Sequence, residues 1–389
     1  MRAPPEPPPS RCPAPDGGIG FGTPERVLTC AFGAYGLARA GPSALTYASL
    51  DVVSWRHIVS LEVGEMTATT THALDAAVEA ARWAPSVHNT QPWSFAVSPE
   101  EISLRADTDR KLRVSDEGGR ELLISCGAAL FTMRTALRRA GFEQVVRILP
   151  DPDKPALLAT VRAGAAIEPD KRTRLLSAEI ERRRTHRAGF VGLPVPDRLI
   201  DALVKDAAGE GAKLTPVRSP QAVEVLASLT RAAQGVQSAD RRFSLEVIRW
   251  ARPPGSSRQD GVPAEGYPRE PVRTDPRFAQ RDYAWRHDWG GEGDQSTQTS
   301  AGVVAMLTTS GDSRRDWIAA GEALQRVLLH ASAYGVSAAF HTQVLELGHL
   351  REFLRQELCS GEFPQMIMRL GITFEDTNSV RRPLSDLTE

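Results

Sequence analysis

The sequence predicts an α+β protein in which two similar α/β halves are fused in one chain, with antiparallel or mixed sheets flanked by helices. Two observations lead to this fold class. Helical runs with one apolar face alternate with short apolar strand signals along the chain. The two longest helical runs also share Gly, Ala, Leu and Gly at one spacing, at positions 127, 129, 130 and 141 and again at 321, 323, 324 and 335. Such a repeat predicts halves packed about a pseudo-two-fold axis, as in an isologous dimer.

The first half is predicted to cover residues 66–168. Apolar residues from Leu74 to Ala81 recur at helical spacing, and Pro85 ends this helix. The pattern then predicts strands over 93–97 and 102–106, a helix over 121–140 that stops at Gly141, and a strand over 157–162 that ends in Arg-Ala-Gly.

The second half is predicted to cover residues 169–389 and to repeat this plan. After a helix that starts near Asp170, the pattern predicts a strand over 302–309, a helix over 316–334 and a strand over 364–371 that ends in Arg-Leu-Gly. Chance identity of a few small residues is the alternative to a true repeat, but the neighbouring strands match as well as the helices. The segment 252–300 is long and rich in Pro, Gly, Arg and aromatic residues. We expect it to form a lid over a site, with a solvent-facing linker as the alternative.

The N-terminal segment, residues 1–65, is predicted to be a disordered leader or the product of an over-long start-codon assignment. Half of the first ten residues are proline, and no sustained period of either kind follows them. The apolar run over 27–37 follows this Pro-rich segment rather than a compact basic one, so it makes a poor secretory signal.

The composition excludes several function classes. Lys and Arg number 47 against 48 Asp and Glu, so a net charge of −1 gives no global field for nucleic acid or anionic lipid. No run of eighteen apolar residues predicts a membrane span. The four cysteines are scattered without a CxxC pair, which favours a reduced, cytoplasmic setting and no metal site. Any anion-binding site must therefore be local.

The stretch Ala84–Trp93, APSVHNTQPW, ends a helix with prolines and small polar residues. Prolines remove backbone donors at fixed points, and the remaining N–H and amide groups can bond a flat polar heterocycle. An ordinary helix-to-strand connection is the alternative.

A run of basic residues over 181–187, ERRRTHR, is the highest local charge in the chain. Guanidinium groups pair with phosphate oxygens in two-point geometry, so Arg182, Arg183, Arg184 and Arg187, with the Thr185 hydroxyl as a further donor, predict a phosphate clamp. A solvated basic face is the alternative. The pair Arg381-Arg382 near the C-terminus is expected either to close this clamp or to face solvent.

A helix, then APSxxNxQPW, then a strand resembles the nitroreductase-like family of FMN-binding proteins. The resemblance covers residues 71–387 and is similar to the fused, two-domain Acg-type branch, which is dormancy-associated. It implies that the loop over 85–91 approaches the flavin and that the basic run, which matches the family's Arg-Arg-Ser/Thr-x-Arg motif, binds the FMN phosphate. The cofactor-binding residues it implies are Pro85, Ser86, Val87, Asn89, Gln91, Arg183, Arg184, Thr185, Arg187, Phe340, Thr342, Gln343, Arg381 and Arg382.

The order of the motifs departs from the family pattern, in which the basic run precedes the loop within one unit. Here the loop lies in the first half and the basic run in the second. We therefore expect one composite FMN site per chain and a second, empty site. Because the chain contains its own pseudo-dimer, a monomer and a homodimer are both consistent with the sequence.

The resemblance implies two-electron transfer from NAD(P)H through FMN to a small-molecule acceptor, such as a nitroaromatic or a quinone. The protein then supplies orientation and electrostatics, so no catalytic acid or base is assigned. One alternative is a catalytically silent flavin store or stress-response protein whose lid covers the FMN. A more distant alternative is an interaction protein that kept only the scaffold.

Overall fold

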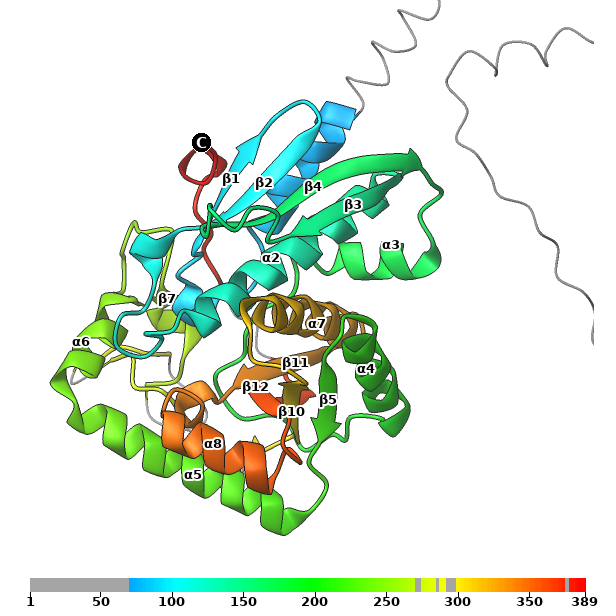
Figure 1. Cartoon of the computed structure of the whole chain (residues 1–389). Coiled ribbons are helices and arrows are strands. Elements are labelled where there is room, and N and C mark those ends of the chain that lie inside the picture. Colours follow the sequence, from blue (N-terminus) through cyan, green and yellow to red (C-terminus); the bar gives the residue numbers. More distant parts are fainter. Residues whose placement is uncertain (1–69, 270–273, 285–286, 292–298, 375–377) are drawn as a thin grey trace, which may run out of the picture. The chain divides into compact units, whose positions relative to one another are not determined.

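The computed structural model describes residues 70–389 except 270–273, 285–286, 292–298 and 375–377 (Figure 1). The prediction for residues 1–65 lies outside this described part. Within it the chain is α+β, and both four-stranded sheets are antiparallel, which confirms the predicted fold class. No helix in the described ranges is long and apolar enough to cross a membrane.

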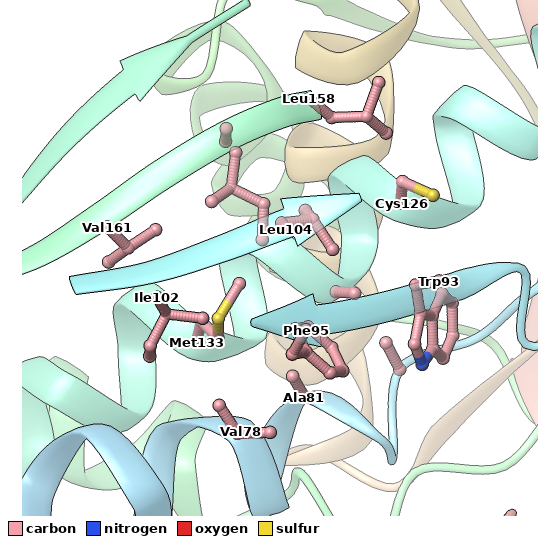
Figure 2. Close-up of a cluster of buried hydrophobic side chains, with 14 of the residues drawn as sticks. Val78, Ala81, Trp93, Phe95, Ile102, Leu104, Cys126, Met133, Leu158 and Val161 are labelled. Carbon is pink, nitrogen blue, oxygen red and sulfur yellow. The ribbon is translucent and has the colours of Figure 1, made fainter. Parts of the chain in front are cut away.

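The first sheet has the strand order β1-β2-β4-β3 and follows a helix over residues 70–81. Its strands are β1 (Trp93–Val97), β2 (Glu101–Ala106), β3 (Phe142–Ile148) and β4 (Leu157–Ala166). Helix α2 (Arg120–Arg139) joins β2 to β3 and packs against this sheet. Figure 2 shows the resulting core, in which Trp93 and Phe95 of β1 meet Cys126 and Met133 of α2.

The second sheet repeats this order of elements. Helix α4 (Asp197–Gly209) precedes β5 (Lys213–Pro216) and β10 (Val303–Thr309), and helix α7 (Arg314–Ser332) leads to β11 (Val336–Phe340) and β12 (Phe363–Ile372). The strand order is β11-β12-β10-β5. In both sheets, the strands numbered along the chain are therefore arranged first, second, fourth, third.

Helices α2 and α7 lie against each other between the two sheets (Figure 1). They cross at Gly127 and Gly321, where the contact is reciprocal. A Cβ atom on Gly127 would lie 2.1 Å from the carbonyl oxygen of Ile318, and one on Gly321 would lie 2.0 Å from that of Ile124. Each carbonyl belongs to the residue three positions before the opposing glycine, as an isologous contact requires.

The ends of these two helices follow recognised sequence signals. Ser313 and Asp316 form a reciprocal capping box at the start of α7, and the Asp116 carboxylate accepts from the N–H groups of Glu121 and Leu122 in α2. Gly141 and Gly335 follow the C-termini with φ of 93° and 72°, a conformation that glycine adopts without strain.

The remaining helices are α3 (Lys171–Ala178), α5 (Pro220–Ala239), α6 (Arg241–Arg249) and α8 (Gly348–Glu357). The helix expected near Asp170 is α3, but it ends at Ala178, so the basic run follows the helix instead of ending it. The reason is that Thr185 pairs with Ala338 of β11 and the N–H of His186 donates to the Ala338 carbonyl, which holds this backbone extended.

The segment over 252–300 contributes short strand pairs in its described parts. Strand β6 (Ala251–Arg252) pairs with β7 (Val262–Pro263), and β8 (Thr274–Asp275) pairs with β9 (Thr299–Ser300). A cluster that includes Phe243, Val247, Val262, Tyr267 and Tyr283 packs this segment against α6.

The last described residues return to the first half of the molecule. The N–H of Phe95 in β1 donates to the Leu387 carbonyl at 2.7 Å, and the N–H of Glu389 donates to the Phe95 carbonyl at 3.0 Å. The side chain of Leu387 is buried in the first core. Figure 1 shows this end of the chain beside β1.

We predict that Gly127→Ala lowers the free energy of unfolding by at least about 2 kcal/mol, because the new methyl group overlaps a backbone carbonyl that has little room to move. Chemical denaturation measures this change. Gly235→Ala in α5 is the matched control, since its Cβ would meet no atom within 4 Å and the helix gains from the higher propensity of alanine. Equal stability of the two variants would show that the helices do not cross this closely.

Candidate functional site

A cavity lies beside the crossing of α2 and α7. Ile124 and Ala128 of α2 and Leu324 of α7 form part of its lining. The rest of the lining comes from other residues of α2, the loop over 85–88, residues 185–187, β11 with the loop after it, β12 and the segment over 252–300. The cavity therefore draws on both halves of the chain, as the split motifs predict for a composite site.

The loop over 85–91 has an unusual backbone. His88, Asn89 and Gln91 have φ of 46°, 54° and 49°, in the left-handed region that non-glycine residues rarely occupy. Each such residue costs on the order of 1 kcal/mol or more and persists only where surrounding contacts hold it. Strain of this kind is typical of functional sites.

The contacts that hold the loop come from distant segments. The Asn89 amide donates to the Gly261 carbonyl at 2.9 Å, and the Gln91 amide donates to the Gln259 carbonyl at 3.0 Å. The N–H of Val87 donates to Ser125 Oγ of α2 at 3.1 Å, and the N–H of Arg382 donates to Gln91 Oε1 at 2.8 Å. The fold as a whole thus determines the shape of the loop.

A second, smaller pocket adjoins the cavity and carries positive charge. Arg184, Thr185, Arg187 and Arg381 line it together with the loop residues Pro85, Ser86 and Asn89. Pro85, Ser86, Thr185 and Arg187 also line the cavity, so the two spaces are continuous. We call the smaller space the anion pocket.

Two guanidinium groups near the anion pocket are buried and have no counterion among the described residues. Arg183 and Arg381 are 4% and 7% exposed, and the described residues include no carboxylate in an ion pair with either. The Nε atoms of both side chains have no hydrogen-bond partner in the described structure. Burial, and after it the charges of neighbouring Arg184 and Arg187, lower the pKa of Arg183 to about 9. The pKa of Arg381 is also lowered, by burial first and then by Arg183, Arg184 and Arg187. A bound anion would reverse both effects.

Trp83 contacts three guanidinium groups of this cluster, those of Arg183, Arg184 and Arg381. Its carbonyl oxygen accepts from Arg183 Nη2 at 3.3 Å and from Arg381 Nη2 at 3.1 Å. The guanidinium carbons of Arg184 and Arg381 lie 5.1 and 5.6 Å from the centre of its ring. These contacts orient the cations without neutralising them.

The structure brings most of the predicted cofactor-binding residues together. Pro85, Ser86, Val87, Asn89, Arg184, Thr185, Arg187, Phe340, Thr342 and Arg381 line the cavity or the anion pocket. Arg183 lines an adjoining hollow with Arg182 and Arg184. Gln91, Gln343 and Arg382 line neither space: Gln91 bonds Gln259 and Arg382, Gln343 bonds Gln234 and Ala279, and Arg382 bonds Gln91 and Asp386. These three side chains contact neighbouring segments and do not line the site.

Some cavity residues were not assigned from the sequence, and Arg369 of β12 is the least expected. Its guanidinium is almost fully buried between the rings of Phe190 and Phe278, at 5.3 and 5.4 Å, and burial lowers its pKa to about 10. Arg369 Nε donates to His341 Nε2 at 2.7 Å, and His341 Nδ1 lies 3.1 Å from the Ala279 carbonyl. This arrangement requires a neutral His341 that carries its proton on Nδ1. Burial and the Arg369 charge accordingly lower the pKa of His341.

Glu121 adds a carboxyl group to the cavity lining. It lies in the first turn of α2 and is 3% exposed, with Arg120 Nη2 at 2.8 Å from its Oε1. Burial and nearby Glu346 raise the pKa of Glu121 to about 8, against the opposing effect of Arg120. Glu346 itself pairs with Arg281, a further cavity residue, at 2.5 Å. No short sequence motif identifies Glu121, Arg281 and Glu346, because they come together only in the folded chain.

The corresponding place in the second half is filled. The connection between helix and first strand spans 82–92 in the first half but only 210–212 in the second. Glu322 follows the crossing glycine Gly321, where Ala128 follows Gly127. Arg134 pairs with Glu322 at 2.6 Å and with Glu210 at 2.7 Å, and Arg326 pairs with Glu210 at 2.7 Å. A charged network therefore occupies the space that the first half leaves open.

The described residues form an α+β fold in which an anion pocket adjoins a cavity with an apolar floor. No model of an established protein family matches the sequence. The chain is 33% identical over 294 residues to a Mycobacterium tuberculosis (strain H37Rv) protein named "Putative NAD(P)H nitroreductase Rv3131", a match that covers 74% of this chain and 81% of the relative. It is 27% identical over 332 residues to a protein of the same strain named "Putative NAD(P)H nitroreductase acg", and this match covers 82% of the chain and 96% of the relative. The chain belongs to the nitroreductase-like FMN family.

Solved structures that the chain matches include a BluB-like flavoprotein from Clostridium difficile 630, which is 11% identical with a TM-score of 0.35. That match covers 54% of this chain and 96% of the other. Another is the FMN-dependent nitroreductase NfnB from Mycobacterium smegmatis in complex with NADPH, at 15% identity and a TM-score of 0.33, covering 56% and 97%.

We predict that His341 makes the protein less stable as the pH falls below about 6.5. The folded pKa lies below the ordinary value of 6.5, so the unfolded chain takes up a proton in this range that the folded state excludes. The stability advantage of wild type over His341→Gln should shrink by about 1 kcal/mol per pH unit below pH 6. Urea denaturation at pH 7, 6 and 5 measures this. The exposed His349→Gln is the control, and an advantage that does not change with pH would contradict a neutral His341.

Proposed function

We propose that the chain binds one FMN and transfers two electrons from NAD(P)H to a small oxidised acceptor. The observation that carries this proposal is the anion pocket. The buried guanidinium groups of Arg381 in its lining and of Arg183 in the adjoining hollow have no ion pair among the described residues, and the pocket adjoins a larger cavity with an apolar floor. A phosphate attached to a flat ring system matches both parts.

The anion pocket fits the phosphate end of FMN. Among the described residues, Arg381 in the pocket and Arg183 in the adjoining hollow each keep an unpartnered Nε. The hydrogen bonds of Arg187 to the Thr185 and Gly266 carbonyls are long, at 3.5 Å. A phosphate dianion would give these donors charge-assisted hydrogen bonds and offset the repulsion between them. The Thr185 side chain adds a neutral donor.

The cavity fits the ring end. Ile124, Ala128, Leu324, Ala339 and Met366 provide apolar lining against which a flat aromatic system can pack. Arg187, Arg281 and Arg369 place positive charge in the same lining. When bound, FMN would supply the redox chemistry by accepting a hydride from a nicotinamide and passing the electrons to an acceptor. The arginines would stabilise the negative charge that forms on reduction.

The asymmetry of the halves supports the proposal of one FMN per chain. The ion pairs of Arg134, Glu210, Glu322 and Arg326 occupy the second place, and its shortened connection has no counterpart to the loop over 85–91. Both parts of the proposed site belong to one chain, so a monomer is sufficient for binding.

A flavin-storage role is the second candidate, and one observation favours it. Tyr267, Pro268, Gln280, Arg281 and Tyr283 of the segment over 252–300 line the cavity, so this segment closes one side of it, as expected of a lid. A lid that stays closed would shield a bound flavin from nicotinamides.

We predict that Arg183→Ala and Arg187→Ala each weaken FMN binding at least tenfold, or about 1.4 kcal/mol, because each removes a charge-assisted contact to phosphate. Titration of apoprotein with FMN measures the affinity and should saturate at one equivalent per chain. Arg182→Ala is the matched control from the same run, since the Arg182 side chain is 76% exposed. Two equivalents at saturation, or affinity unchanged in both variants, would refute the proposed site.

We predict that excess NADPH or NADH bleaches the FMN-loaded protein within seconds under anaerobic conditions, as an accessible flavin requires. The flavin absorbance follows the reaction. A yellow colour that persists with both nicotinamides but disappears with dithionite would instead support the storage role.

A further inference from the structure

Glu121 is the only carboxyl group among the described residues that line the cavity. It lies in the first turn of α2 and is 3% exposed. Two further carboxyl groups lie near it without lining the cavity: Asp116 is 5% exposed, and the Glu346 side chain is 1% exposed. Three acidic side chains therefore share a region with little access to water, where each negative charge disfavours the ionised form of the others.

Hydrogen-bond donors are divided unequally among these three acids. The Glu346 carboxylate accepts from Arg281 Nη2 at 2.5 Å, from Thr342 Oγ1 at 2.8 Å and from Gln237 Nε2 at 2.9 Å. The Asp116 carboxylate accepts from two backbone N–H groups of α2, at 2.8 and 3.1 Å. Such bonds favour the ionised form of an acid, so they stabilise the negative charge on both side chains.

Glu121 receives fewer donors than its neighbours. Among the described residues, its side chain accepts from Arg120 Nη2 at 2.8 Å, and the same guanidinium group donates to the Gln365 carbonyl through Nη1 at 2.6 Å. Burial and the charge of Glu346 raise the pKa of Glu121 to about 8 against the effect of Arg120. Of the three acids, Glu121 is therefore the one that keeps a proton at neutral pH, and it keeps it inside the cavity.

The charge inside the cavity would change when a flavin bound there is reduced. Three arginines in the lining, Arg187, Arg281 and Arg369, carry positive charge in both redox states. A hydride transferred to the ring system brings one negative charge into the same space. This charge disfavours a carboxylate beside it, so Glu121 would bind its proton more tightly when the flavin is reduced than when it is oxidised.

We propose that Glu121 couples reduction of the bound flavin to proton uptake: its carboxylate takes one proton from water when the flavin is reduced and returns it to water when the flavin is reoxidised. The proton balances the negative charge that the hydride brings. Below about pH 8 Glu121 holds this proton in both redox states, and above about pH 8 it holds the proton only in the reduced state. The proposal rests on the proposed function and adds a proton-binding residue to it.

Other titratable groups of the lining form a background to this proton. They are His88, His186, His341, Tyr267 and Tyr283. Burial lowers the pKa of His88 and of His341, and burial raises the pKa of Tyr267, so these three stay neutral between pH 7 and 9.5. Any titration of the other two is common to wild type and to a Glu121 variant, so the difference between the two proteins isolates Glu121.

The reduction potential of the bound FMN, measured against a reference dye from pH 7 to 9.5, tests the coupling without turnover. Uptake of one extra proton lowers the reduction equilibrium by an extra tenfold per pH unit, which is about 30 mV for a two-electron couple. We expect the wild-type potential to acquire this extra slope above about pH 8 and Glu121→Gln, which cannot ionise, to lack it. Glu121→Asp keeps an acid at this position and should restore the extra slope.

A matched control comes from the segment just before α2. Glu117 is exposed and does not line the cavity, so Glu117→Gln should follow wild type over the whole pH range. Glutamine resembles the neutral acid in size and polarity, so Glu121→Gln should keep the fold. Parallel curves for wild type and Glu121→Gln across the range would overturn the proposal, as would an equal loss of slope in Glu117→Gln.

A second measurement needs no flavin. In FMN-free protein labelled with ¹³C at the glutamate carboxyl groups, the NMR signal that is missing from Glu121→Gln reports the protonation of Glu121. We expect this signal to titrate near pH 8. A midpoint below pH 6 would show an ionised Glu121 paired with Arg120, and would overturn the proposal.

The outcome separates this inference from the proposed function. If NAD(P)H fails to bleach the flavin while the extra slope is present in a potential measured with dithionite as the reductant, the oxidoreductase proposal fails and the coupling through Glu121 stands. If NAD(P)H bleaches the flavin and the slope does not depend on Glu121, the coupling fails alone.

Discussion

The close crossing of α2 and α7 is the contact on which the rest of the structure depends. Because Gly127 and Gly321 present no side chain, the two helices approach until carbonyl oxygens touch the opposing backbone. This approach joins the two sheets through their helices, and it places Ile124 and Ala128 beside Leu324 at the floor of the cavity. Ser125 on the same helix then holds the strained loop through the N–H of Val87. The site is thus a product of how closely two helices pack.

The repeated halves have similar backbones but very different side chains around this crossing. Ala128 leaves space beside Gly127, whereas Glu322 beside Gly321 enters a network with Arg134 and Glu210. Burial raises the pKa of Glu322 to about 7 in spite of the Arg134 charge, so this network carries the cost of desolvation. On the other side of the crossing, the strained loop of the first half lies near two cations of the second half, Arg183 and Arg381, that have no ion pair among the described residues. Polar groups without partners persist where a ligand can satisfy them.

The fold class, the repeat and the segments that line the candidate site can be predicted from the sequence, because each depends on a local residue pattern. The predicted helix over 121–140 and strand over 364–371 agree with α2 and β12 within one or two residues. Neither β3 nor β11 is among the predicted strands. Burial alternates along β3, as its residue pattern indicates, whereas β11 is short and rich in small residues. Arg369 and Glu121 were not assigned, because their burial depends on Phe190, Phe278 and Glu346 from distant segments. The motif likewise marks Gln91 and Gln343 without showing that their side chains turn away from the cavity.

The path of the C-terminal segment has a consequence for how the protein is made. Arg381 contacts Asn89 across 292 residues of sequence, and Leu387 fills part of the first core. During synthesis, the loop over 85–91 and the first sheet leave the ribosome long before these partners exist. Until the C-terminal segment has been made, the first half therefore lacks part of its core, and the loop lacks the contact with Arg381. This differs from the general rule that domains fold as units from the N-terminus. The candidate site, built from both ends of the chain, is therefore complete only after synthesis of the chain has ended.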